Sequence, residues 1–224
     1  MGETVQLTDH DKIFRRAVIM AQASSVSPLD VLLERSSTGD LVAPAPQGEV
    51  LARILSAGLR APDHGHLCPW RYVVIAGDAR PAFAGHVVAA VARQEPDAPE
   101  KKREKRRRRF SETPMVIALG MHLRPEHKVP VMEQEMAVAA GAMNVLNALH
   151  MEGFGGVWIS GRFCEDRSLL SQLGLEAPHR LAGFLLVGTP EKPERAHVRP
   201  DVGDHVAFWD GQTPVTFGAD DRQR

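Results

Sequence analysis

The stretch that most constrains the fold is residues 133–161, EQEMAVAAGAMNVLNALHMEGFGGVWISG. From Met136 to Leu146 it is apolar or small on nearly every side. A helix that is apolar all round is buried all round, and small side chains let another backbone come close. We therefore expect a long central helix, then a tight turn at the glycines 153, 155 and 156, which only glycine adopts at low cost, and then a strand at Val157–Ser160.

Two interpretations of this stretch are open. It can be a core helix with a tight connection to the next strand. It can also be a helix packed against a partner subunit, with a cofactor held where the strand ends. The residues alone do not decide between them.

The composition is that of a globular protein. A chain of 224 residues can bury a sizeable core as one domain, and 43% hydrophobic with 25% charged residues is an ordinary balance. A net charge of −1 gives no overall attraction to nucleic acid or membrane, and two cysteines indicate a reducing compartment rather than a disulfide framework. We recognise no signal peptide and no membrane span, so we expect a cytoplasmic protein.

Helical and strand patterns alternate along the chain. Ser27 and Pro28 suit the N-cap and first position of a helix that runs to Glu34, and apolar spacing predicts a second helix over 50–59. Further helices are expected over 80–93, 101–109 and 166–173, and buried strands over 71–76, 115–123, 157–160 and 181–187. This order predicts a mixed α/β or α+β sheet layered with helices.

We divide the chain into three parts. Residues 1–26 are an N-terminal extension, polar at first and then weakly helical, and residues 27–190 are the domain. Residues 191–224 are a tail rich in proline and charge. We expect it to pack on the domain or on a partner, with Phe208 and Trp209 as anchors.

Two short polar segments are candidates for chemistry. Arg35, Ser36 and Ser37 offer a guanidinium and two hydroxyls to a phosphate, or else form an ordinary helix C-cap. His64, His66 and Cys68 follow a His-x-His-x-Cys pattern that can ligate zinc or iron, although a polar loop lining a pocket fits the spacing better.

The window 101–109 holds eight basic residues and one acidic residue. It lacks interleaved aromatic residues, so we expect a solvated helix rather than a nucleic-acid site, with attraction of a phosphate-bearing substrate as a secondary role. The glycines 153–156 lie between a helix and a strand, the reverse of the dinucleotide-binding order. The phosphate-binding loop Gly-x-x-x-x-Gly-Lys-Ser/Thr and the nucleophile motif Gly-x-Ser-x-Gly are both absent from the sequence.

Several motifs, taken in order, resemble the FMN-dependent nitroreductase family, most of all its small single-domain, YdjA-type branch. They are Leu-Leu-Glu-Arg-Ser-Ser at 32–37, Ala-Gly-Leu-Arg-Ala-Pro-Asp-His at 57–64, Pro-Trp-Arg-Tyr-Val-Val-Ile at 69–75, His-Lys-Val-Pro at 127–130, Glu-Gln-Glu-Met at 133–136, Gly-Phe-Gly-Gly-Val-Trp at 153–158 and Gly-Phe-Leu-Leu-Val-Gly-Thr-Pro at 183–190. The resemblance covers about residues 27–190. It implies an α+β fold with a mixed, mainly antiparallel sheet, in an intertwined homodimer with the central helix at its interface.

The resemblance also implies the site residues. Each FMN would be held by both subunits: the phosphate and ribityl chain by Arg35, Ser36 and Ser37, and the same site from the other subunit by Arg60 and His64. The flavin ring would lie along Trp158, Ile159 and Ser160, with backbone N–H groups near N5. The nicotinamide nucleotide would lie at the end of the helix, at Ala148, Leu149, His150, Met151, Glu152 and Gly153. This chain departs from the common family pattern at Ser36, Cys68 and Ile159, where Arg, Gln and Arg are frequent; these changes bear on flavin affinity and acceptor choice.

The reaction implied by the resemblance is ping-pong. NADH or NADPH gives a hydride to flavin N5 and leaves, and a nitroaromatic, quinone or activated enone then takes electrons at the same face. No side chain acts as a nucleophile and no metal is expected; His64 or His66 is a candidate proton donor. The alternatives are a flavin-binding protein without turnover, a non-nitro flavin reaction such as dehalogenation or flavin fragmentation, and a metal enzyme that uses the His-x-His-x-Cys loop.

Overall fold

The computed structural model describes residues 27–192 and 198–217. The predicted N-terminal extension, residues 1–26, therefore lies outside the described residues. The chain divides into a large unit, which ends at Glu194, and a small unit, which begins at Arg195. The described elements of the large unit are α2 (Pro28–Glu34), β1 (Leu41–Val42), α3 (Gly48–Gly58), β2 (Trp70–Ala76), α4 (Ala79–Gln94), α5 (Glu100–Glu112), β3 (Met115–Met121), α6 (Val131–Met151), β4 (Gly155–Ile159), the 3-10 helix η1 (Arg162–Glu165), α7 (Arg167–Gln172) and β5 (Arg180–Pro190).

The sheet of the large unit is antiparallel at every described pairing, so the predicted α+β class is confirmed. Its order is β1-β5-β3-β2, and β4 pairs with β5. The eleven-residue β5 binds β3 along one edge and two short strands along the other: β4 pairs with residues 184–188, and β1 with 189–190. Because β1 has only two residues, its pattern is too short to be recognised in the sequence.

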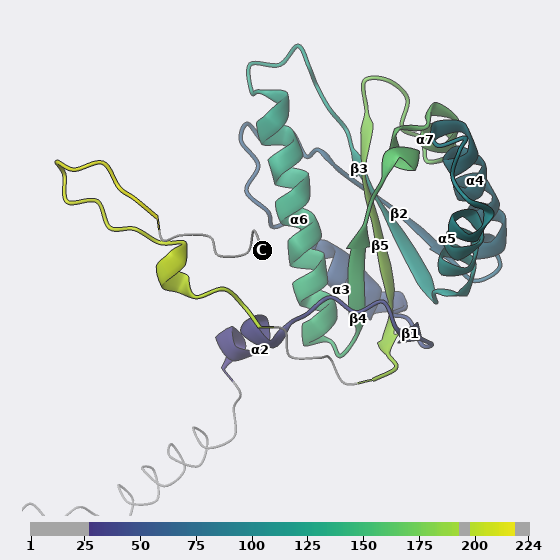
Figure 1. The fold of residues 1–224 in the computed structure, drawn as a ribbon, viewed down its shortest axis with the longest axis horizontal. Coiled ribbons are helices and arrows are strands. Elements are labelled where there is room, and N and C mark those ends of the chain that lie inside the picture. The colour runs from purple at the N-terminus through teal and green to yellow at the C-terminus, as the bar shows by residue number, and fades with distance from the viewer. Residues whose placement is uncertain (1–26, 193–197, 218–224) are drawn as a thin grey trace, which may run out of the picture. The chain divides into compact units, whose positions relative to one another are not determined.

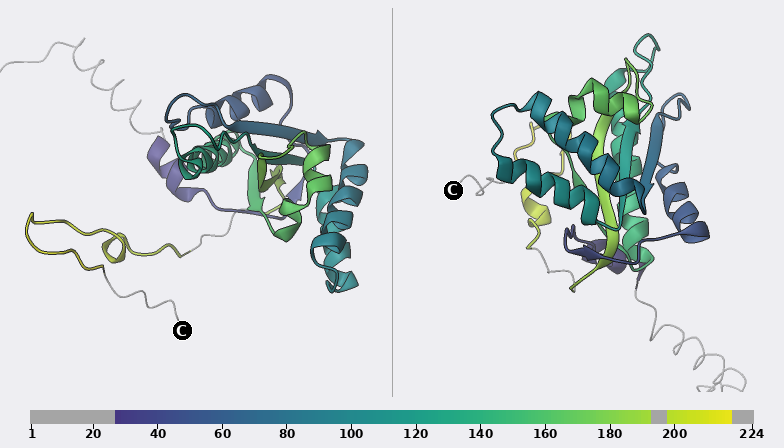
Figure 2. Two further views of the ribbon diagram at one scale, coloured as in Figure 1. Left: turned by 90° about the horizontal axis from the view of Figure 1, so that it is seen from above. Right: turned by 90° about the vertical axis from the view of Figure 1, so that its right-hand side faces the viewer.

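Helices cover both faces of the sheet (Figure 1). Along β3, Val116 and Ala118 pack with α4, α5, η1 and α7, whereas Ile117 and Leu119 pack with α3 and α6. This alternation follows from the two-residue period of a strand. Figure 2 shows α4 and α5 lying together on one side of the sheet, away from α6. Strands buried on both faces read as continuous apolar runs, which is why β3 and β5 were predictable.

The packing of α6 against α3 is unusually close. A Cβ placed on Gly141 would lie 2.8 Å from the carbonyl oxygen of Gly58 in α3 and 2.7 Å from the hydroxyl of Tyr72. The expectation that small residues on the central helix admit another backbone is therefore met by a helix of the same chain. Beside this contact, the indole of Trp70 donates to the carbonyl of Ala137 at 2.8 Å.

One face of α6 is not buried in the single chain, which corrects the expectation of a helix buried all round. Met132 is 60% exposed, Met136 58% and Met143 39%, and Ala139 is exposed between them. These positions follow one another at steps of three or four residues, so they form one stripe along the helix. We call these four residues the methionine stripe.

The turn after α6 also differs from the expectation. Only Gly153 has a left-handed φ, at +80°, while Gly155 and Gly156 belong to β4, which begins two residues earlier than predicted. A Cβ on Gly155 would lie 2.7 Å from Thr38 Cγ2, and one on Gly156 would lie 3.2 Å from the carbonyl of Leu186. These two glycines therefore permit close packing of neighbouring segments rather than a turn.

The small unit is described over residues 198–217. Asp201 caps the 3-10 helix η2 (Val202–Asp204) by accepting a hydrogen bond from Gly203 N at 2.7 Å. Phe208 and Trp209 are exposed, so their role as anchors stays a prediction. None of the described helices, in either unit, has both the length and the apolar character needed to cross a membrane.

Candidate functional site

The segment that carries Arg35, Ser36 and Ser37 lies against the free edge of β4. Ser27 caps α2 by accepting from Leu29 N at 3.2 Å, and Arg35 ends the helix in an extended conformation, with φ −54° and ψ 129°. The chain then runs to Thr38, whose N–H donates to the carbonyl of Gly156 at 3.3 Å. Two segments about 120 residues apart in the sequence are thus joined by a backbone hydrogen bond.

The orientation of β4 decides which of its groups a ligand can reach. The carbonyl of Ile159 faces β5, because it lies 2.5 Å from the place of a Cβ on Gly183. The carbonyl of Gly156 faces the opposite way, toward Thr38. Since backbone groups alternate along an antiparallel strand, the N–H and C=O of Trp158 also point to the free edge.

The side chains of β4 pack against the hydrophobic core. Trp158 packs on the α3–α6 face and donates from Nε1 to the carbonyl of Ala182 at 3.2 Å. Ile159 packs on the opposite face. Gly183, with φ +135°, makes room for Trp158. What β4 offers to a ligand is therefore its backbone, together with the exposed Ser160 beyond its end.

Arg60 and His64 lie elsewhere in the single chain. Both are exposed, and His64 Nδ1 is 2.7 Å from Glu133 Oε2 in the first turn of α6. The Thr38–Gly156 contact lies beside the last turns of the same helix, because a Cβ on Gly156 would lie 3.1 Å from Leu146 and 3.4 Å from Leu149. Since α6 has 21 residues and rises about 1.5 Å per residue, most of a ~30 Å helix separates His64 from this contact.

The segment Ala148–Gly153 is the end of α6 and the turn after it. Leu149 is fully buried, so its side chain belongs to the core. Glu152 is paired with Arg53 at 3.4 Å. His150 and Gly153 line a cavity of about 400 Å³ with Phe154 and residues 189–192. The nicotinamide assignment of this segment stays a prediction.

The His-x-His-x-Cys loop has an irregular backbone. His66 and Cys68 have φ of +53° and +50°, and Cys68 N donates to the carboxylate of Asp63 at 2.7 Å. Over the residues that the structure describes, no group of three or more His, Cys, Asp or Glu side chains is arranged to hold a metal ion. His64 is instead engaged with Glu133.

Two arginines of α5 lie beside the candidate segments. The sequence did not distinguish these two from the other basic residues of the helix. Arg109 Nη2 is 2.9 Å from the place of a Cβ on Gly39, two residues after Ser37. Arg106 lies 5.0 Å from the ring centroid of Phe163 and 3.8 Å from the place of a Cβ on Gly161, the residue after Ser160. Burial and the neighbouring charge of Arg109 lower the pKa of Arg106. In the sequence these two were hidden within a run of similar charges.

A family model described as the nitroreductase family matches residues 32–189 of this chain. A protein of Escherichia coli (strain K12), provisionally named an NAD(P)H nitroreductase, YdjA, is 36% identical over 182 residues, which cover 81% of this chain and 98% of that protein.

Solved structures share the fold. A nitroreductase-like family protein from Bacillus cereus has a TM-score of 0.72 at 24% identity, and covers 84% of this chain and 99% of that one. An iodotyrosine deiodinase bound to FMN and 3-iodo-L-tyrosine has a TM-score of 0.62 at 19% identity. The match covers 84% of this chain and 100% of the deiodinase chain.

Proposed function

Because the chain belongs to the nitroreductase family, we propose that it is an FMN-dependent oxidoreductase that uses NADH or NADPH to reduce a small organic acceptor, such as a nitroaromatic compound or a quinone. The observation that carries the proposal is the Thr38–Gly156 hydrogen bond. It holds a segment with a guanidinium and two hydroxyls beside a strand edge to which the backbone N–H and C=O of Trp158 point.

The groups at this edge suit a phosphorylated flavin. Arg35 supplies a charged donor for the phosphate, and the Ser36 and Ser37 hydroxyls suit the phosphate or the ribityl chain. The outward N–H of Trp158, and the N–H of Ser160 by the same alternation, suit acceptor atoms of the ring. When bound, FMN supplies the hydride-transfer chemistry, and the protein positions it and tunes its electronics.

We further propose that the site is completed in a homodimer. The methionine stripe exposes an apolar face of α6 that a second copy would bury. If two copies of α6 pack about a two-fold axis in opposite directions, the start of one helix lies beside the end of the other. His64, and Arg60 close to it, would then reach the partner's Arg35–Ser37 segment, which they do not approach within one chain.

A second candidate function is a non-nitro reaction on the same scaffold. The deiodinase shares the fold, and fold alone does not fix the reaction. Ser36, Cys68 and Ile159 replace residues that are common in the family, so the acceptor can differ as well. Assays with nitroaromatic, quinone and halogenated aromatic acceptors, run side by side on one preparation, separate these reactions.

The main test is spectroscopic. The purified protein should be yellow or should take up FMN stoichiometrically, and anaerobic NADH or NADPH should bleach its visible absorption. A colourless protein that rejects FMN would overturn the proposal. A yellow protein that neither NADH nor NADPH bleaches would support flavin binding without turnover.

A residue-level test is Arg35→Ala. We expect FMN to bind about tenfold more weakly or worse, because the phosphate loses a charge-assisted partner. FMN affinity is measured by fluorescence quenching, and the fold by circular dichroism. Arg167→Ala removes an exposed arginine from α7 as the control. Equal FMN affinity in both variants would show that Arg35 does not hold the phosphate.

A further inference from the structure

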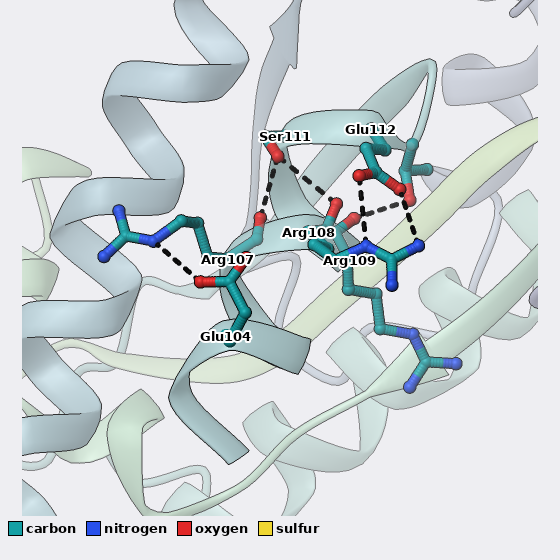
Figure 3. A network of polar contacts seen from close by, with 7 residues as sticks. Glu104, Arg107, Arg108, Arg109, Ser111 and Glu112 are labelled. Atoms are coloured by element: carbon teal, nitrogen blue, oxygen red, sulfur yellow. Dashed lines mark hydrogen bonds and ion pairs between the residues drawn. The ribbon is translucent and has the colours of Figure 1, made fainter. Parts of the chain in front are cut away.

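The basic residues of α5 fall into two groups that the sequence does not distinguish. Four of them have carboxylate partners: Lys102 with Glu95, Arg103 with Glu100, Arg107 with Glu104 and Arg108 with Glu112. Figure 3 shows the last two pairs. Arg106 lies over the ring of Phe163. Each of these five cations therefore interacts with a carboxylate or an aromatic ring of the protein.

The other three are Lys101, Lys105 and Arg109. Over the described residues, their side chains have neither a carboxylate partner nor a side-chain hydrogen bond. They are spaced by four residues, so they lie in a row along one face of the helix. Like charges at this spacing destabilise a helix, and Arg109 is half-buried besides.

This row faces a cavity of about 590 Å³ between α5 and the segment at Gly39 and Asp40. The three unpaired cations line it together with Arg108, Asp40, Glu104 and Glu112. Two of the three carboxylates are already paired with arginines, Glu104 with Arg107 and Glu112 with Arg108. The cavity therefore carries an excess of positive charge, and its volume is within the range of small-molecule sites.

We propose that this cavity binds a small phosphate-bearing molecule. Phosphate oxygens would give Lys101, Lys105 and Arg109 the acceptors that none of the described residues supplies, and would relieve the repulsion along the helix. Asp40 would accept from a hydroxyl of the same ligand. The three residues of this row share the cavity and have no acidic partner among residues 27–192 and 198–217, whereas four other basic residues of α5 form ion pairs.

The site differs from the proposed flavin-phosphate site, and the inference stands without it. The phosphate can belong to the 2′ position of NADPH or to a separate molecule; the chemistry of recognition is the same. Gly39 fits the assignment, because a Cβ there would lie 2.9 Å from the Arg109 guanidinium and would push it from the cavity wall.

The test is calorimetric titration of the full chain with inorganic pyrophosphate at low ionic strength, where surface charges are least screened, with and without saturating FMN. We expect saturable binding that is about tenfold weaker or worse in Arg109→Gln and in the double variant Lys101→Gln/Lys105→Gln. The matched control is Lys102→Gln. Lys102 lies on the same helix but is paired with Glu95 and lies outside the cavity, so this variant should bind pyrophosphate as the unmodified chain does. Circular dichroism confirms that the variants fold; the double variant changes only exposed residues.

The outcomes are distinct. Displacement of pyrophosphate by NADPH but not by NADH assigns the phosphate to the reductant, and displacement by neither assigns it to a separate molecule; both support the site. Equal binding in the cavity variants and the Lys102→Gln control overturns it. So does binding that is lost in Arg35→Ala but kept in Arg109→Gln, or binding of an RNA homopolymer with no response to pyrophosphate. Flavin content is read separately from absorbance, so the proposed function and this site can fail independently.

Discussion

The hydroxyl of Tyr72 is buried at the contact between α3 and α6 and has no hydrogen-bond partner over the described residues. Burial raises its pKa to about 12. An unsatisfied buried hydroxyl is unfavourable, so Tyr72→Phe should leave the stability unchanged or raise it by up to about 1–2 kcal/mol. Urea unfolding measures this. A large loss of stability would show that the hydroxyl has a partner in solution, such as a bound water or a second subunit.

Asp166, unlike the Tyr72 hydroxyl, is a buried polar group whose two carboxylate oxygens both accept hydrogen bonds. It accepts from Arg93 Nε at 2.8 Å and Nη2 at 2.7 Å, and it caps α7 by accepting from Leu169 N at 2.9 Å. The hydrogen bonds from Arg93 lower its pKa to about 2. Because the folded-state pKa lies below the unfolded value of about 4, the charge stabilises the fold above that pH, by roughly 2 kcal/mol.

This stabilisation should be lost as the pH falls from about 4 toward 2. We expect Asp166→Asn, which keeps a capping oxygen, to be less stable than the unmodified chain near neutrality, with the difference shrinking in that acid range. Denaturant unfolding at several pH values gives the comparison, with the exposed Asp30→Asn as control. A difference that does not change with pH would contradict the role of the charge.

At the scale of elements, the packing of α6 on α3 rests on Gly141. A Cβ there would lie 2.7 Å from Tyr72 Oη and 2.8 Å from both Gly58 O and Trp70 Cδ1. We expect Gly141→Ala to destabilise the protein by about 1–3 kcal/mol, although alanine is the better helix former by about 1 kcal/mol.

The matched control for this substitution is Gly85→Ala in α4, where a Cβ would meet nothing within 4 Å. There the gain in helix propensity should appear alone, as about 0.5–1 kcal/mol of added stability. Urea midpoints of the two variants should therefore move in opposite directions. If Gly141→Ala also gains stability, the two helices are farther apart in solution than in this structure.

At the scale of the whole molecule, the methionine stripe is the basis for the proposed homodimer. Met136→Glu places a charge in the middle of this apolar face and should shift the protein toward the monomer, because an unpaired charge would have to be buried. Sedimentation velocity measures the change. Val74→Glu, at a comparably apolar exposed site on β2, is the control. A Met136→Glu protein that remains dimeric would place the interface elsewhere. Loss of bound FMN with the dimer would support a site shared between subunits.

The individual elements were largely predictable from the sequence because their signals are local. The cap at Ser27 with Pro28 placed the start of α2 at the residue where the structure begins it, and continuous apolar runs marked β3 and β5. The missed features depend on neighbours: β1 exists as a strand through its pairing with β5, and β4 begins at Gly155 because β5 pairs with the glycines as well.

The sequence by itself determined the order of helices and strands and the central helix, and its ordered motifs, through the resemblance that they carry, gave the family and the α+β class. Periodicity, caps and apolar runs are properties of consecutive residues, so one chain of letters carries them. Only the tertiary structure decided that Thr38 meets Gly156, that Trp158 turns its side chain inward and its backbone outward, and that His64 lies at the far end of α6. It alone separated the paired cations of α5 from Lys101, Lys105 and Arg109. These contacts join segments that are far apart in the sequence, and local sequence patterns do not show which distant segments will be in contact.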